Sequence, residues 1–176
     1  MRLSRLFLAI LVFPAALAAQ TTVILTRHAE KAAAPADDPP LTAEGEARAR
    51  ALFTAVKDAG ISAIITTNFA RTKATAAPTA SALGITPEAL VARDPNHVQA
   101  VVDAVRRHTG RTVLVVGHSN TVPAIIAALG APRPPDICDA TYDDLFVVTL
   151  HPDGKATFVH SRYGAPSPAA TCASMK

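Results

Sequence analysis

Short, continuous apolar segments alternate with longer segments in which apolar residues recur every three or four positions along most of this 176-residue chain. The short segments are typical of strands buried between two layers of helices, and the longer ones of amphipathic helices. The pattern predicts strands at 22–26, 62–66, 112–116, 145–150 and 156–161, and helices at about 42–58, 72–83, 96–108 and 122–129. This alternation predicts an α/β fold, a three-layer α/β/α sandwich with a mostly parallel mixed sheet.

Turn-forming residues mark the ends of these elements. Thr42 suits the cap of the first helix, and a glycine follows each expected helix, at positions 60, 84, 110 and 130. Pro78 lies inside the second helix, so we expect that helix to be kinked or split. Pro152-Asp153-Gly154 separates the last two strands, which predicts an antiparallel hairpin.

The first residues follow the order of a secretory signal peptide. Arg2 and Arg5 precede an apolar run from Leu6 to Leu17, and the small residues at 16–19 suit cleavage. The run is shorter than the ~20 residues that a membrane span needs, although a membrane anchor is the alternative. We therefore expect a periplasmic or secreted protein. Its parts are a signal peptide at 1–19, one domain at 20–162 and a loose C-terminal tail at 163–176.

Charge and cysteine content add little about partners. The formal net charge is +3, and it falls to +1 when Arg2 and Arg5 are removed with the signal peptide. A nearly neutral domain gives no electrostatic reason to expect binding to nucleic acid or to anionic membranes. Cys138 and Cys172 would meet an oxidising compartment after export. There we expect a disulfide that ties down the tail, with two free thiols as the alternative.

Basic residues follow the first three expected strands. Arg27 and His28 come directly after the first strand, Arg71 opens the helix after the second, and His118 lies at the turn after the third. Parallel neighbouring strands end at one edge of a sheet, where open α/β folds bind ligands, so we expect these side chains to converge. Two guanidiniums and two imidazoles around one point repel each other, but together they suit a phosphoryl group.

Four stretches resemble the histidine phosphatase superfamily, also called the phosphoglycerate mutase-like family. They are Leu-Thr-Arg-His-Ala-Glu-Lys at 25–31, Leu-Thr-Ala-Glu-Gly at 41–45, Thr-Asn-Phe-Ala-Arg-Thr-Lys-Ala-Thr-Ala at 67–76 and Val-Gly-His-Ser-Asn at 116–120. The resemblance implies the family fold and an exported phosphatase that needs no metal or cofactor. It would hydrolyse phosphomonoesters or phosphoamidates through a phosphohistidine. A non-catalytic phosphate-binding module and a phosphomutase are the alternatives.

The resemblance also implies a role for each matching residue. His28 would be the nucleophile, while Arg27, Arg71 and His118 would hold the phosphoryl oxygens. Asn120 would bind phosphate or orient His118, with a plain helix cap as the alternative. The substrate would be a phosphorylated small molecule, an envelope component or a phosphoprotein.

The match ends at the acid that protonates the leaving oxygen. One branch of the family has an aspartate after the second histidine, where this chain has Ser119. Glu30 and Asp94 are the first candidates for this acid, although Glu30 is as well explained by an ion pair. Further candidates are Asp37, Asp38, Glu88 and Asp103. A site without a strong acid favours good leaving groups, such as those of acyl phosphates, phosphoamidates and aryl phosphates.

Two loops, 32–40 and 132–144, are the only segments with room for a lid, which indicates an open pocket. In the second loop, Tyr142-Asp143-Asp144 reads as a turn or as part of the pocket rim. We expect the remaining histidines to face solvent. They are His97, His108, His151 and His160.

Overall fold

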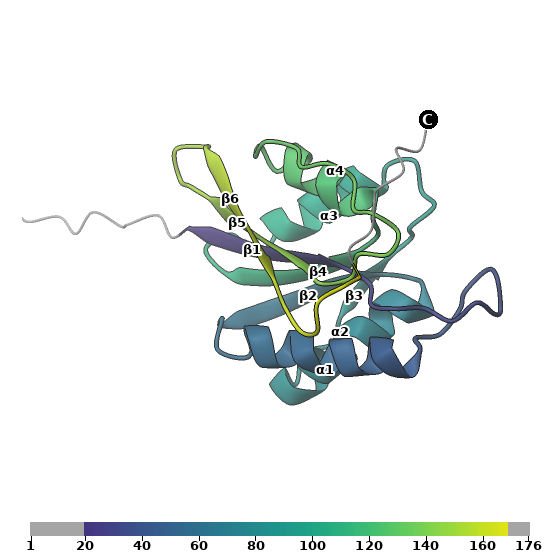
Figure 1. Ribbon diagram of the computed structural model, residues 1–176. Helices are drawn as coiled ribbons and strands as arrows, with labels where there is room; N and C mark the ends of the chain where they lie inside the picture. The colour runs from purple at the N-terminus through teal and green to yellow at the C-terminus, as the bar shows by residue number, and fades with distance from the viewer. Residues whose placement is uncertain (1–19, 169–176) are drawn as a thin grey trace, which may run out of the picture.

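A computed structural model describes residues 20–168 and shows a mixed sheet between two pairs of helices (Figure 1). Within these residues the six strands lie in the order β3-β2-β4-β1-β5-β6. The elements are β1 Thr21–Arg27, α1 Ala43–Val56, β2 Ile61–Thr67, α2 Ala70–Leu83, β3 Glu88–Leu90, α3 His97–Arg106, β4 Thr112–Gly117, α4 Thr121–Ala128, β5 Asp144–Leu150 and β6 Ala156–Arg162. The first four strands of the sheet are parallel, and the β5–β6 hairpin is antiparallel. The predicted three-layer sandwich is confirmed.

The central strand β1 is buried on both faces, as its continuous apolar sequence requires. Side chains of a strand alternate between the two faces of the sheet. Val23 and Leu25 pack in the core that α3 and α4 cover, while Ile24 packs in the core that α1 and α2 cover. Both helix layers therefore fix the position of β1, and with it the position of the residues that follow.

Two local features differ from the sequence-based expectation. Helix α2 begins at Ala70, two residues earlier than expected, and Pro78 lies inside it without splitting it. The carboxylate of Asp38 accepts the hydrogen bond of the Ala70 N–H, which satisfies a free donor at the start of this helix. The short edge strand β3 was not predicted, because three half-exposed residues carry no periodic signal.

The segment after β6 is bonded to the domain rather than loose, as far as residue 168. Tyr163 is 5% exposed and packs in the core beside α1 and α2. The Tyr163 N–H donates to the Asp143 carbonyl, the Ser167 N–H donates to the Asp143 carboxylate, and the Ala165 carbonyl accepts from Arg48. We call residues 163–168 the C-terminal segment.

Some expectations fall outside the described residues. The signal peptide at 1–19 and the remainder of the tail, including Cys172, lie there. Within residues 20–168 no cysteine is free, and no helix is both long and apolar enough to cross a membrane.

Candidate active site

The four predicted residues meet at the carboxyl ends of β1, β2 and β4. Arg27 is the last residue of β1 and pairs in register with Gly117, the residue before His118. The His28 N–H donates to the Gly117 carbonyl at 2.9 Å, which joins the two strand ends. The imidazole rings of His28 and His118 are 5.4 Å apart between centroids. Parallel strands ending together therefore produce the predicted cluster.

His28 is held in one tautomer. Its Nδ1 lies 2.8 Å from the Ala29 carbonyl oxygen, which can only accept, so Nδ1 carries the hydrogen and Nε2 carries a lone pair. Burial lowers the pKa of His28 to about 3, with smaller contributions from the charges of Arg27 and Arg71. His28 is thus a neutral imidazole with a nucleophilic nitrogen over the whole physiological range.

His118 is oriented by two threonine hydroxyls. Its Nε2 lies 3.2 Å from Thr67 Oγ1, and its backbone N–H donates to Thr121 Oγ1. Burial, followed by the charge of Arg71, lowers the pKa of His118 to about 4. Asn120 is exposed and its side chain makes no capping hydrogen bond, so Thr121 provides the local contact expected of Asn120.

Arg27 is anchored through one end of its guanidinium. Nη1 donates to the carbonyls of Cys138, Asp139 and Thr141, at 2.9 to 3.1 Å. The guanidinium carbon lies 4.3 Å from the ring centroid of Tyr142, in cation–π range. Nε is buried without a hydrogen-bond partner among the described residues. We call residues 138–142 the Arg27 loop.

Arg71 is anchored in a similar way. Its Nη1 lies 3.6 Å from a carboxylate oxygen of Asp38, and its guanidinium carbon lies 4.1 Å from the ring centroid of Phe69. Its Nε, like that of Arg27, is buried and unpartnered within residues 20–168. Orphan donors of this kind cost free energy unless an acceptor reaches them. Both guanidiniums therefore present unused donors at the same strand edge as the two imidazoles.

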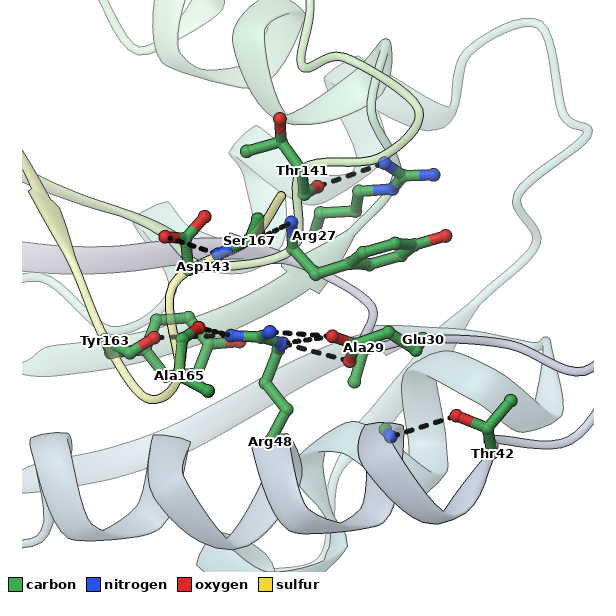
Figure 2. A network of polar contacts seen from close by, with 12 residues as sticks. Arg27, Ala29, Glu30, Thr42, Arg48, Thr141, Asp143, Tyr163, Ala165 and Ser167 are labelled. Atoms are coloured by element: carbon green, nitrogen blue, oxygen red, sulfur yellow. Dashed lines mark hydrogen bonds and ion pairs between the residues drawn. The ribbon is translucent and has the colours of Figure 1, made fainter. Parts of the chain in front are cut away.

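A second polar network supports the turn that follows His28 (Figure 2). Arg48 on α1 donates from Nε to both oxygens of Glu30 at 2.8 and 2.9 Å, and its Nη2 lies 2.7 Å from Glu30. Its Nη1 donates to the carbonyls of Tyr163 and Ala165. Arg48 thereby joins α1, the turn after His28 and the C-terminal segment.

The Arg27 loop is connected to the same network. The buried Asp143 binds Arg162 through both of its carboxylate oxygens, each at 3.0 Å. The Tyr142 N–H donates to Ser167 Oγ in the C-terminal segment. Although burial opposes ionisation, the hydrogen bonds from Ser167 and Arg162 lower the pKa of Asp143. Of the two readings of Tyr142-Asp143-Asp144, the structure therefore favours the pocket rim.

Comparison with known proteins identifies this arrangement. The model of the histidine phosphatase superfamily (branch 1) matches residues 23–93, which include Arg27, His28 and Arg71. The chain belongs to the histidine phosphatase superfamily. His118 lies beyond the matched residues and joins the other three through the fold. No curated protein matches the chain in sequence.

Solved structures of other proteins share the fold. A protein histidine phosphatase SixA, complexed with tungstate, is 25% identical with a TM-score of 0.61, over 80% of this chain and 96% of that one. A phosphoglycerate mutase from Bacillus anthracis str. Sterne is 17% identical with a TM-score of 0.63, over 82% and 93%. Bacillus stearothermophilus YhfR is 21% identical with a TM-score of 0.59, over 81% and 96%. The similarities to the phosphoglycerate mutase and to YhfR show a shared fold alone.

Most of the candidate acids for protonating the leaving oxygen bond to other groups of the protein. Both Glu30 oxygens accept hydrogen bonds from Arg48, so Glu30 is already paired within the protein. Asp38, which from sequence alone is a weaker candidate acid than Glu30 and Asp94, pairs with Arg71. Three further candidates bond elsewhere: Asp94 to the Asn96 N–H, Glu88 to Arg107 and Asp103 to Gln99. Asp37 is exposed in the loop before α1.

His97 departs from the expectation that the remaining histidines face solvent. It is 4% exposed at the start of α3, and burial lowers its pKa. The apolar positions of α3 include Val101 and Val105, four and eight residues further on, so His97 lies on the buried face of the helix. No group of His, Cys, Asp or Glu within residues 20–168 is arranged to hold a metal ion.

Proposed function

We propose that this protein is an exported phosphatase that forms a phosphohistidine on His28 and prefers substrates with good leaving groups, phosphoamidates above all. The observation that carries the proposal is the neutral His28 imidazole. Its Nε2 lone pair lies in a cluster with the guanidiniums of Arg27 and Arg71. A nucleophile that stays deprotonated among cations requires an electrophile that carries negative charge, and a phosphoryl group is one.

The reaction has two balanced steps. His28 Nε2 attacks phosphorus, a P–N bond forms, and the bond to the leaving group breaks with its electron pair. The orphan donors of Arg27 and Arg71, together with His118, stabilise the charge on the phosphoryl oxygens. Water then attacks phosphorus, the P–N bond breaks, and inorganic phosphate and neutral His28 are released. The side chains supply the positive charge of the site, so the proposed reaction needs no metal.

The leaving group is inferred from the carboxylates. Glu30 bonds Arg48, Asp38 bonds Arg71 and the start of α2, and Asp139 lies 3.7 Å from Arg27. Each of these carboxylates is therefore already paired with an arginine or a backbone N–H and is not positioned as a free acid beside the leaving oxygen. Leaving groups that need no proton from the protein suit such a site. An acidic phenol departs as its anion, and a phosphoamidate nitrogen that already carries a proton departs as a neutral amine. The similarity to a protein histidine phosphatase supports a phosphohistidine protein as one such substrate.

A pre-steady-state experiment tests the mechanism. Purified protein is mixed with radiolabelled phosphoramidate or para-nitrophenyl phosphate and quenched in alkali, in which phosphohistidine survives. We expect a labelled protein, a burst of leaving group, and loss of both in His28→Ala. Full turnover by His28→Ala contradicts the nucleophile. Phosphate binding without turnover of any substrate favours a binding module, and phosphate transfer to a second hydroxyl favours a mutase.

The proposed export rests on residues 1–19, whose basic, apolar and small-residue order is that of a signal peptide. Expression of the full chain in a Gram-negative host, followed by fractionation and mass spectrometry, tests it. We expect a periplasmic protein whose N-terminus lies near Gln20. An intact N-terminus in the cytosolic fraction contradicts the proposed location.

A further inference from the structure

A cavity of about 700 Å³ lies beside the catalytic centre and has no role in the reaction described above. Glu30, two residues after the nucleophile, and Tyr142 are among its lining residues. The Tyr142 ring is 6.2 Å from the His28 ring between centroids, and it also lies against Arg27. The cavity therefore adjoins the site, and Tyr142 borders both. Its volume is within the roughly 300–1,000 Å³ that is usual for small-molecule sites.

The walls of this cavity are mostly apolar. They come from α1, the Arg27 loop and the C-terminal segment. The apolar lining residues besides Tyr142 are Ala47, Ala51, Ala140, Ala165, Pro166 and Pro168. Small side chains on three separate elements leave a space that one larger group can fill. Tyr142 adds an aromatic face against which a flat ring can stack.

The charged groups around the cavity cancel each other. Glu30 and Arg48 form the buried ion pair already described, and they satisfy each other. Lys31 and Glu44 are exposed and carry opposite charges. An anionic leaving group therefore meets no net attraction here, while an uncharged apolar group loses no hydrogen bond on entry.

We propose that this cavity is a leaving-group subsite that takes an uncharged aromatic group attached to the phosphoryl group. The proposal rests on the proposed function, because it assumes that phosphate is held at Arg27, Arg71 and His118. It extends that function by naming the substrate class, aryl phosphates and aryl phosphoamidates. Burial of one additional fused ring should strengthen binding by about tenfold or more.

Binding to the His28→Ala protein tests the subsite without depending on turnover. Calorimetry compares phenyl phosphate, 2-naphthyl phosphate and a carboxylated naphthyl phosphate, with inorganic phosphate as reference. Ala47→Trp, made in the same background, fills the cavity from α1. Ala55→Trp is the matched control, because Ala55 is also exposed on α1 but does not line the cavity.

We expect 2-naphthyl phosphate to bind about tenfold more tightly than phenyl phosphate, and the carboxylated analogue to lose this gain. Ala47→Trp should remove most of the difference and leave phosphate binding unchanged, and Ala55→Trp should preserve it. Equal affinities for the two aryl phosphates overturn the subsite, as does a difference that Ala47→Trp leaves intact. A naphthyl preference in His28→Ala, combined with no turnover of any substrate by the unsubstituted protein, overturns the proposed reaction alone. No binding of any phosphate overturns both proposals.

Discussion

Replacement of Arg48 by methionine distinguishes a structural role of Glu30 from a catalytic one. The Arg48 side chain is 6% exposed and that of Glu30 is 22% exposed, so the pair is largely removed from water. Loss of one partner of a buried ion pair costs about 3–5 kcal/mol, mainly because the other charge is left uncompensated. Since Glu30 retains some contact with water, we expect Arg48→Met to lower the free energy of unfolding by about 2–4 kcal/mol.

Urea denaturation followed by circular dichroism measures this effect, and a double-mutant cycle assigns it. Glu30→Gln combined with Arg48→Met should be more stable than Arg48→Met alone, because no unpaired carboxylate remains. Arg107→Met is the control, since Arg107 and Glu88 form an exposed pair that is worth about 1 kcal/mol at most. A loss below about 1 kcal/mol in Arg48→Met would refute the reasoning.

The same variants report on catalysis. If Glu30 only supports the turn after the nucleophile, Glu30→Gln lowers activity on alkyl and aryl phosphates by the same factor. If Glu30 donates a proton, the loss is confined to alkyl phosphates, whose leaving groups need protonation. A large selective loss on alkyl phosphates, in a protein of unchanged stability, would assign Glu30 as the acid after all.

The remaining predictions concern pH, charge and packing. Folding lowers the pKa of His28 to about 3 and of His118 to about 4 from 6.5, so the unfolded chain takes up protons first. Stability should therefore be full above pH 6.5 and fall from there down to about pH 3, the pKa of folded His28. Over the same range kcat/KM, corrected for substrate ionisation, should show no loss of the nucleophile above about pH 5. Asp38→Asn removes a carboxylate that competes with the substrate for the Arg71 guanidinium. It should lower the Ki of inorganic phosphate about two- to fivefold at low salt. An unchanged Ki contradicts this competition. Gly45→Ala should destabilise by about 2 kcal/mol or more in thermal unfolding, because its Cβ would collide with the Glu30 carbonyl oxygen; a stabilised variant would show that α1 moves away freely.

The sequence predicted the parts of the molecule that depend on local pattern. A continuous apolar segment indicates a buried strand, and an amphipathic segment followed by glycine indicates a helix. Once the strands are taken as parallel neighbours, Arg27, His28, Arg71 and His118 must meet. The burial of His97 was predictable as well, because it precedes Val101 and Val105 at helical spacing, but its polar side chain suggested solvent.

Contacts between distant segments could not be predicted in this way. Arg48 and Glu30 are 18 positions apart, and Arg27 is more than 110 positions from the carbonyls that anchor it. Neither spacing belongs to a helix or a strand, so no periodic signal marks it. The C-terminal segment looked loose because its composition is typical of loops, whereas its order comes from hydrogen bonds to Asp143 and Arg48.

The position of β1 in the middle of the sheet has a consequence for how the protein is made. This strand is synthesised before both of its partners, β4 from Thr112 and β5 from Asp144. Until most of the chain has left the ribosome, β1 has no strand to pair with, and such distant pairing slows folding. The carbonyls that anchor Arg27 and the C-terminal segment come later still. The site is therefore complete only after synthesis is nearly finished, so the chain is still unfolded at the stage when the proposed export would begin.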